Sequence, residues 1–196
     1  MSRRLLLATT NAGKQDEFRR LLAPLAADVV APADVGLDLE VDEPFDTYAE
    51  NAATKAAAFA RAAGLPSLAD DSGIEVAALD WGPGVRSARW GGGRNAERLV
   101  ETLAGATDRR ARMVCALALA VPGDPEPEIE IFTGEVSGWV TTAPRGERGF
   151  GYDPVFELPD GRTTAELEEA EKDRISHRGR AVAAALPRLR ELLGGR

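Results

Sequence analysis

Apolar positions along the chain follow two patterns, nearly continuous runs and runs with a helical period. Nearly continuous apolar runs at residues 5–9, 29–31 and 111–121, in which only Thr9 and Arg112 are polar, predict buried β-strands. Between the first two, apolar residues recur every three or four positions over residues 14–25, which predicts an amphipathic helix. A strand, a helix and a second strand in succession are typical of α/β proteins.

Two T-x-x-E spacings mark helix starts, since a threonine and the glutamate three residues later satisfy free backbone N–H groups. Thr47 and Glu50 open an alanine-rich helix that runs to residue 63, where Gly64 ends it. Thr163 and Glu166 repeat the spacing. The last helix is expected to begin after Ser176 and to carry its apolar face along residues 182–193.

The middle of the chain predicts a β-hairpin. Residues 111–121 are followed by a turn rich in Pro, Asp and Glu, and residues 129–136 then alternate as a partner strand does. We therefore expect a mixed α/β sheet with flanking helices, formed by one domain over residues 1–196. Residues 87–94, rich in Gly, are expected to be mobile, with a helix over 95–103 that Asn95 caps.

Charge and composition narrow the classes of protein. The net charge of −8 argues against broad contact with a nucleic-acid backbone, which needs a basic face. No apolar run is long enough to span a membrane, and the one near the N-terminus is too short for a signal peptide. Cys115 is the single cysteine, so no internal disulfide forms and a reducing cytoplasm is expected.

A short polar segment after the first strand is the first candidate for chemistry. Free N–H groups and the positive dipole end of a helix attract phosphate, and Lys14 adds a mobile positive charge. The segment has too few glycines for a Walker loop, so it predicts phosphate binding without an ordinary ATPase. The candidate residues are Thr9, Thr10, Asn11, Ala12, Gly13 and Lys14.

Adjacent carboxylates form the second candidate. Asp70 and Asp71 follow a short predicted strand, where such a pair can hold a divalent cation or activate water. Side chains alternate along a strand, so the two need not share a role. By itself, the run Asp70-Asp71-Ser72-Gly73 is better interpreted as a turn. Lys55, in the helix that begins after Thr47, either points toward a phosphate or is exposed.

Two later segments are candidates for recognising a base. Residues 149–154 combine two glycines with Phe150 and Tyr152, and aromatic rings can stack on a base, although a tight turn with core aromatics is the alternative. His177 and Arg178 lie at a predicted helix start. His177 follows Lys172 by five residues. Taken alone, a single histidine is more often structural.

The ordered set of motifs is far more specific than any member. It closely resembles the dITP/XTP pyrophosphatase family, also known as inosine triphosphate pyrophosphatases, over nearly the whole chain. The motifs are T-x-N-x-x-K (9–14), E-N-A-x-x-K-A (50–56), A-D-D-S-G (69–73), P-G-V-x-S-A-R (83–89), G-F-G-Y-D-P (149–154) and I-S-H-R-G (175–179).

This resemblance implies an elongated mixed β-sheet with flanking helices and two lobes around a central active-site groove, usually in a homodimer. It implies hydrolysis of dITP, ITP and XTP to the monophosphate and pyrophosphate with Mg²⁺. Asp71 would be the general base and a metal ligand, with Asp70 beside it. Glu43, or alternatively Asp42, would match the family's metal-linked glutamate, although proline at position 44 departs from the usual motif.

The same resemblance places the phosphates on residues 9–14 and assigns the nucleotide site to a further group. A donor near the 6-oxo group would favour hypoxanthine and xanthine over adenine, and His177 and Arg178 are the candidates. The residues implied to line the site are Ser72, Phe150, Gly151, Tyr152, Asp153, Lys172, His177 and Arg178. Two alternatives remain, a Maf-type pyrophosphatase for dTTP or modified pyrimidine nucleotides, and a nucleotide-binding module without catalysis.

Overall fold

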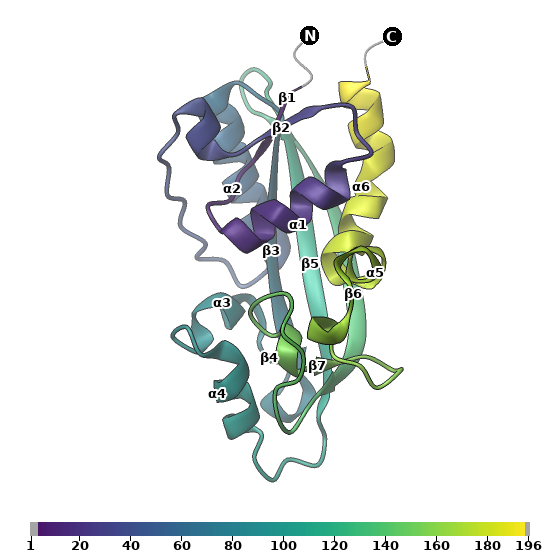
Figure 1. Ribbon diagram of the computed structural model, residues 1–196. Helices are drawn as coiled ribbons and strands as arrows, with labels where there is room; N and C mark the ends of the chain where they lie inside the picture. The colour runs from purple at the N-terminus through teal and green to yellow at the C-terminus, as the bar shows by residue number, and fades with distance from the viewer. Residues whose placement is uncertain (1–3, 195–196) are drawn as a thin grey trace. The chain divides into compact units, whose positions relative to one another are not determined.

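A single mixed sheet forms the framework of the computed structural model, which describes residues 4–194 (Figure 1). The strands are hydrogen-bonded in the order β2-β1-β3-β5-β6-β7, with β4 paired to β3. β1 runs parallel to β2 and β3, whereas β4 and β7 pair antiparallel with β3 and β6. The strands are β1 (Arg4–Leu7), β2 (Asp28–Val30), β3 (Ser67–Val76), β4 (Gly82–Pro83), β5 (Arg110–Val121), β6 (Glu128–Val140) and β7 (Phe156–Glu157).

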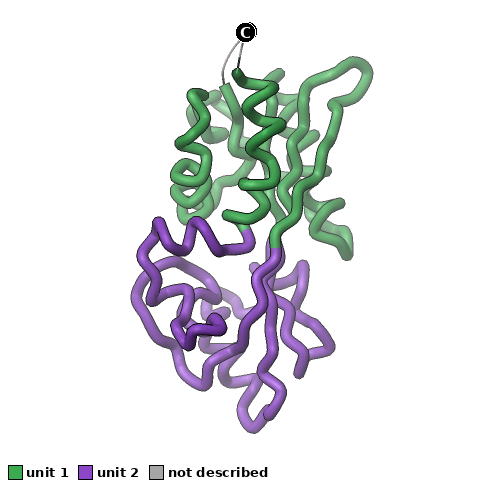
Figure 2. The backbone as a smooth tube through the Cα atoms, turned by 90° about the vertical axis from the view of Figure 1, so that its right-hand side faces the viewer, with its two compact units in different colours: residues 1–71, 115–134, 178–196 green, residues 72–114, 135–177 purple. Residues whose placement is uncertain are grey.

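The chain divides into two compact units, coloured separately in Figure 2. Unit 1 comprises residues 1–71, 115–134 and 178–196, and unit 2 comprises residues 72–114 and 135–177. The α-helices are α1 (Ala12–Leu22), α2 (Tyr48–Ala63), α3 (Ser87–Trp90), α4 (Asn95–Thr102), α5 (Glu169–Ile175) and α6 (His177–Leu193).

Unit 1 buries both faces of its part of the sheet, which explains why its strands are largely apolar on both sides. Side chains alternate along β1, so Leu5 and Leu7 pack with α1 and α6, while Leu6 and Ala8 pack with α2. Figure 1 shows α1 and α6 on one side of the strands and α2 on the other. The carboxyl end of β1 leads into the start of α1, where Lys14 contacts Asp70 of β3.

Unit 2 has its own apolar core. Ile74 and Val76 of β3 pack there with Leu99 of α4 and with Phe156 of β7, which is fully buried. The core also holds Tyr152 from the glycine-rich segment that precedes β7. No helix among residues 4–194 is long and apolar enough to cross a membrane.

Most predicted elements are present, but three local interpretations were wrong. The Asp70–Gly73 run is not a turn, because β3 continues without a break from Ser67 to Val76. Residues 87–90 form helix α3 rather than part of a mobile loop. Asn95 does not cap α4, since its side chain accepts a hydrogen bond from the N–H of Gly91, and the cap position belongs to Arg94.

Candidate active site

The start of α1 presents the predicted phosphate segment. Asn11 is the N-cap, and its side-chain oxygen accepts the N–H of Lys14 at 2.9 Å. The backbone carbonyl of Thr9 accepts a hydrogen bond from Gln15 at 2.8 Å, which closes the turn before the helix. Ala12, Gly13 and Lys14 therefore belong to the first helical turn, where backbone N–H groups and the helix dipole favour an anion.

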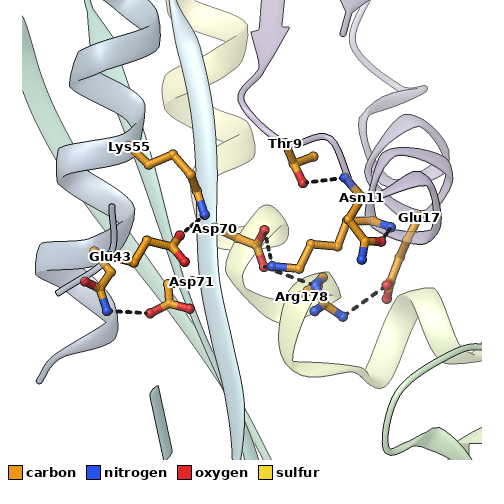
Figure 3. A network of polar contacts seen from close by, with 10 residues as sticks. Thr9, Asn11, Glu17, Glu43, Lys55, Asp70, Asp71 and Arg178 are labelled. Atoms are coloured by element: carbon orange, nitrogen blue, oxygen red, sulfur yellow. Dashed lines mark hydrogen bonds and ion pairs between the residues drawn. The ribbon is translucent and has the colours of Figure 1, made fainter. Parts of the chain in front are cut away.

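Lys14 also enters a buried ionic network with Asp70. Its Nζ lies 2.9 Å from both carboxylate oxygens of Asp70, whose side chain is fully buried. The Nε of Arg178 donates to Asp70 at 3.3 Å, and its Nη1 donates to Glu17 at 3.2 Å (Figure 3). Burial alone would raise the pKa of Asp70, but the charges of Lys14, Arg178 and Lys55 hold it well below its ordinary value.

Asp71 lies on the opposite face of β3 and has a different environment. The buried side chain of Asn51 donates to its Oδ2 at 2.9 Å. Asn51 also accepts the N–H of Phe45 and donates to its carbonyl, so one amide joins the 43–47 loop to Asp71. Burial, together with the nearby charge of Glu43, raises the pKa of Asp71 despite the hydrogen bond from Asn51. A carboxylate with a raised pKa is suited to accept a proton from water.

Glu43 and Lys55 complete this second group, and Lys55 forms an ion pair with Glu43. Of the two interpretations of Lys55, the structure therefore favours a side chain directed into the site. The three predicted metal ligands are not brought together, because Asp70 faces away from Asp71. No group of three or more His, Cys, Asp or Glu side chains among the described residues could hold a metal ion. Glu43 and Asp71 alone still fit Mg²⁺, which is usually bound by one or two carboxylates together with substrate phosphates.

Unit 2 holds a second buried ionic group around Asp153. Lys172 of α5 lies 2.6 Å from its carboxylate, and the two side chains are 8% and 4% exposed. The hydroxyl of Thr164 donates to the same carboxylate at 2.8 Å, and so does the N–H of Phe150. The ammonium of Lys172 also lies 5.3 Å from the centre of the Phe150 ring. Asp153 thus fixes a cation and an aromatic ring side by side.

The structure gives a reason for a glycine at position 149 and a tyrosine at position 152 in the 149–154 segment. Gly149 has a φ of 75°, and a Cβ at this position would collide with the carboxylate of Asp153. Tyr152 is buried, and its hydroxyl donates to the carbonyl of Ser87 at 2.9 Å. Of the two predicted aromatics, Phe150 is thus partly exposed beside Lys172, whereas Tyr152 anchors the segment to the S-A-R motif. Gly151 is exposed at the tip of the turn.

Two other predicted residues have clear positions. Ser72 follows Asp71 in β3 and is partly exposed, and His177 is the buried first residue of α6. Sequence reasoning missed Glu17 as the partner of Arg178 and gave Asn51 no role. Their signals were the K-x-x-E spacing that places Glu17 one turn after Lys14, and the E-N-A motif that contains Asn51.

Comparisons with known proteins identify the family of this chain. A sequence model of the Ham1 family matches residues 5–188. A dITP/XTP pyrophosphatase from Ralstonia nicotianae is 49% identical over 197 residues, which cover 96% of this chain and 97% of that protein. One from Deinococcus deserti is 50% identical over 188 residues, covering 93% of this chain and 87% of that protein.

Solved structures give the same result. A HAM1 protein from Coxiella burnetii superposes with a TM-score of 0.85 at 37% identity, covering 97% of this chain and all of that one. A nucleoside-triphosphatase and dITP/XTP pyrophosphatase from Mycobacterium abscessus gives 0.73 at 41%, covering 94% of this chain and 99% of that one. The fold is thus that of an α/β protein built on a curled mixed sheet flanked by helices. The chain belongs to the Ham1 family.

Proposed function

We propose that this protein is a nucleoside triphosphate pyrophosphatase that hydrolyses dITP, ITP and XTP to the monophosphate and pyrophosphate. The carboxylate of Asp71 carries the proposal. It is buried, it accepts a hydrogen bond from Asn51, and its pKa is raised above the ordinary value. It is a candidate general base for a water that attacks the α-phosphorus. The family relationship and the names of the relatives support the same substrates.

The remaining residues of unit 1 supply positive charge. Pyrophosphate leaves as a highly charged group, so Lys14 and the first turn of α1 are proposed to bind the phosphate tail. Lys55, which is paired with Glu43, adds a second cation. We propose that Mg²⁺ is held by Glu43 and Asp71. When bound, it would neutralise phosphate charge and polarise the reacting oxygens.

Base recognition is assigned to donors that suit a 6-oxo group. Lys172 and Phe150 offer a buried cation and a ring face, and His177 and Arg178 remain candidates for contact with the base. Adenine presents an amino group at position 6, so these donors would be left without an acceptor. Guanine shares the 6-oxo group, so rejection of GTP requires a group at position 2.

We propose that residues 1–196 act as one pyrophosphatase domain and form a homodimer, as the family resemblance implies. Its expected location is the reducing cytoplasm, where Cys115, which is buried, stays a thiol. Analytical ultracentrifugation tests the dimer, and a monomer at micromolar concentration would contradict it.

A product assay tests the activity. The protein is incubated with dITP, ITP, XTP, ATP, GTP and dTTP, with Mg²⁺ or with EDTA, in water enriched in ¹⁸O. We expect pyrophosphate and a monophosphate that carries the label, faster turnover of the first three substrates, and loss of activity with EDTA. Release of orthophosphate, equal turnover of ATP, or a preference for dTTP would contradict the proposal. Binding of ITP without turnover would indicate a nucleotide-binding module.

A further inference from the structure

Four charged side chains in unit 1, three of them buried and the fourth partly exposed, form a chain that the proposed reaction leaves without a full explanation. Lys14 contacts both oxygens of Asp70 at 2.9 Å, and Arg178 reaches Asp70 at 3.3 Å and Glu17 at 3.2 Å. Lys14 and Arg178 share the same carboxylate oxygen, Oδ2 of Asp70. We call this group the charge quartet. Its members come from α1, β3 and α6, with two positive and two negative charges in balance.

The charge quartet is open to solvent at one end only. The side chain of Lys14 is 19% exposed, whereas those of Arg178, Glu17 and Asp70 are 7%, 2% and 0% exposed. An anion that arrives from solvent therefore meets Lys14 first. Asp70 lies directly behind Lys14 and contacts Arg178. A change in the position of the lysine charge therefore alters the electrostatic attraction between Asp70 and Arg178.

The same geometry argues against Asp70 as a metal ligand. Asp70 and Asp71 alternate along β3, and Figure 3 shows them on opposite sides of the strand. Both oxygens of Asp70 already accept from Lys14, and its Oδ2 also accepts from Arg178. A cation could reach this carboxylate only by displacing a lysine that is itself needed for the phosphates.

We infer that Asp70 is a positioning residue that holds Lys14 and Arg178 on one carboxylate, and so couples phosphate binding to the placement of Arg178. The inference rests on the function proposed above. A phosphate that draws the ammonium of Lys14 outward weakens its contact with Asp70, and Asp70 then attracts Arg178 more strongly. Phosphate binding and the orientation of Arg178 are in this way linked without any contact between the two cations.

The first test separates positioning from metal binding. Asp70→Asn is compared with the wild type in hydrolysis of ITP at varied Mg²⁺. We expect kcat/KM to fall about 10- to 100-fold while the half-saturating Mg²⁺ concentration stays within about twofold. If Asp70 were a metal ligand or supported one, its loss would instead lower the metal affinity about 10- to 100-fold. A rise of tenfold or more in that concentration would overturn the inference. The matched control is Glu130→Gln, which removes a carboxylate paired with Arg188 at 2.6 Å and should leave both values unchanged.

The second test measures coupling without turnover. Calorimetry with inorganic tripolyphosphate is carried out on the wild type, Asp70→Asn, Arg178→Met and the double variant. Substitutions of residues in contact have non-additive effects on the free energy of binding. The fold-loss of tripolyphosphate affinity in the double variant should therefore be about tenfold smaller than the product of the fold-losses in the two single variants. If the fold-loss in the double variant equals the product of the single fold-losses, the inference is overturned, even if the wild type hydrolyses ITP. If the fold-loss is smaller than that product but the wild type does not hydrolyse ITP, only the proposed function is contradicted. If the wild type does not bind tripolyphosphate, both are contradicted.

A conservative variant keeps the inference testable if Asp70→Asn does not fold. Asp70→Glu retains the charge and moves the oxygens by one methylene. Positioning predicts a loss of at least about tenfold in kcat/KM at unchanged half-saturating Mg²⁺, because orientation errors of about 1 Å are costly. Wild-type kinetics in Asp70→Glu would indicate that only the charge matters and would overturn the inference.

Discussion

Asp70 and Asp71 are neighbours in β3, yet they lie on opposite faces of the strand and their pKa values are displaced in opposite directions (Figure 3). Asp70 is fully buried between Lys14 and Arg178, so its charge is compensated. Asp71 is buried beside Glu43 and has the amide of Asn51 as a hydrogen-bond donor. Two adjacent residues of the same type therefore have different environments: the charge of Asp70 is compensated within a buried ionic network, whereas the pKa of Asp71 is raised.

The first prediction concerns the cost of keeping Asp71 ionised. Its folded-state pKa lies above the ordinary value of 3.8, so the ionised form destabilises the fold above both values, and this penalty disappears as the pH falls below 3.8. At neutral pH, Asp71→Asn should lower kcat about a thousandfold, which is within the usual contribution of a general base. It should also raise the free energy of unfolding by about 1 kcal/mol, as at other sites where activity opposes stability.

Urea unfolding and ITP hydrolysis at pH 7 check both parts of this prediction. Asp38→Asn, at an exposed aspartate in the 36–47 loop, is the control and should change neither quantity. Retained activity in Asp71→Asn would rule out Asp71 as the base. A loss of stability would show that its charge is compensated in the folded protein.

The second prediction is the opposite dependence on pH for Asp70. Its folded-state pKa is depressed, so the stabilisation is present above the unfolded value near 3.8 and is lost as the pH falls through the lower folded-state value. Removing one member of a buried ionic group costs about 3–5 kcal/mol, so Asp70→Asn should lose that amount at pH 7. The difference from the wild type should shrink below pH 3.8. Urea titrations at several pH values measure it, and a difference that does not change with pH would contradict it.

The sequence predicted much of this fold because its local signals agree with the tertiary structure. The cap at Thr47 and the left-handed Gly64, with a φ of 64°, bound α2 as expected. The long apolar run at 111–121 and the alternating residues after the turn are β5 and β6. Such signals depend on neighbours in the sequence, so they can be interpreted without the fold.

The Asp70–Gly73 segment shows where local signals fail. Asp, Ser and Gly favour turns, but neighbouring strands supply hydrogen bonds that keep these residues in β3. Without a continuous strand, the opposite orientation of Asp70 and Asp71 could not be assigned. Glu17 was missed for a related reason, since its partner Arg178 lies 161 residues away in the sequence.

The third prediction compares two paired carboxylates of unit 2. Asp153 and Lys172 are almost fully buried, so Asp153→Asn leaves an uncompensated cation and should cost about 3–5 kcal/mol of stability. Glu157 pairs with Arg145 at 2.7 Å, but these side chains are 31% and 41% exposed, so Glu157→Gln should cost less than about 1 kcal/mol. Asp153→Asn should also raise KM for ITP, because Lys172 loses the carboxylate that holds it beside the Phe150 ring. Denaturant titrations and initial rates measure both effects, and equal stability losses in the two variants would contradict the prediction.

The last prediction concerns the hydroxyl of Tyr152, which donates to the carbonyl of Ser87 inside unit 2. Tyr152→Phe keeps the ring but leaves a buried carbonyl without this donor, so we expect a loss of about 1–2 kcal/mol. If Tyr152 supports the segment rather than binding the nucleotide through its hydroxyl, kcat/KM for ITP should stay within about threefold of the wild-type value. Burial also raises the pKa of Tyr152 to about 12, so the variant should lose the component that titrates at that pH in an ultraviolet titration. Unchanged stability combined with a large rise in KM would instead place the Tyr152 hydroxyl on the substrate.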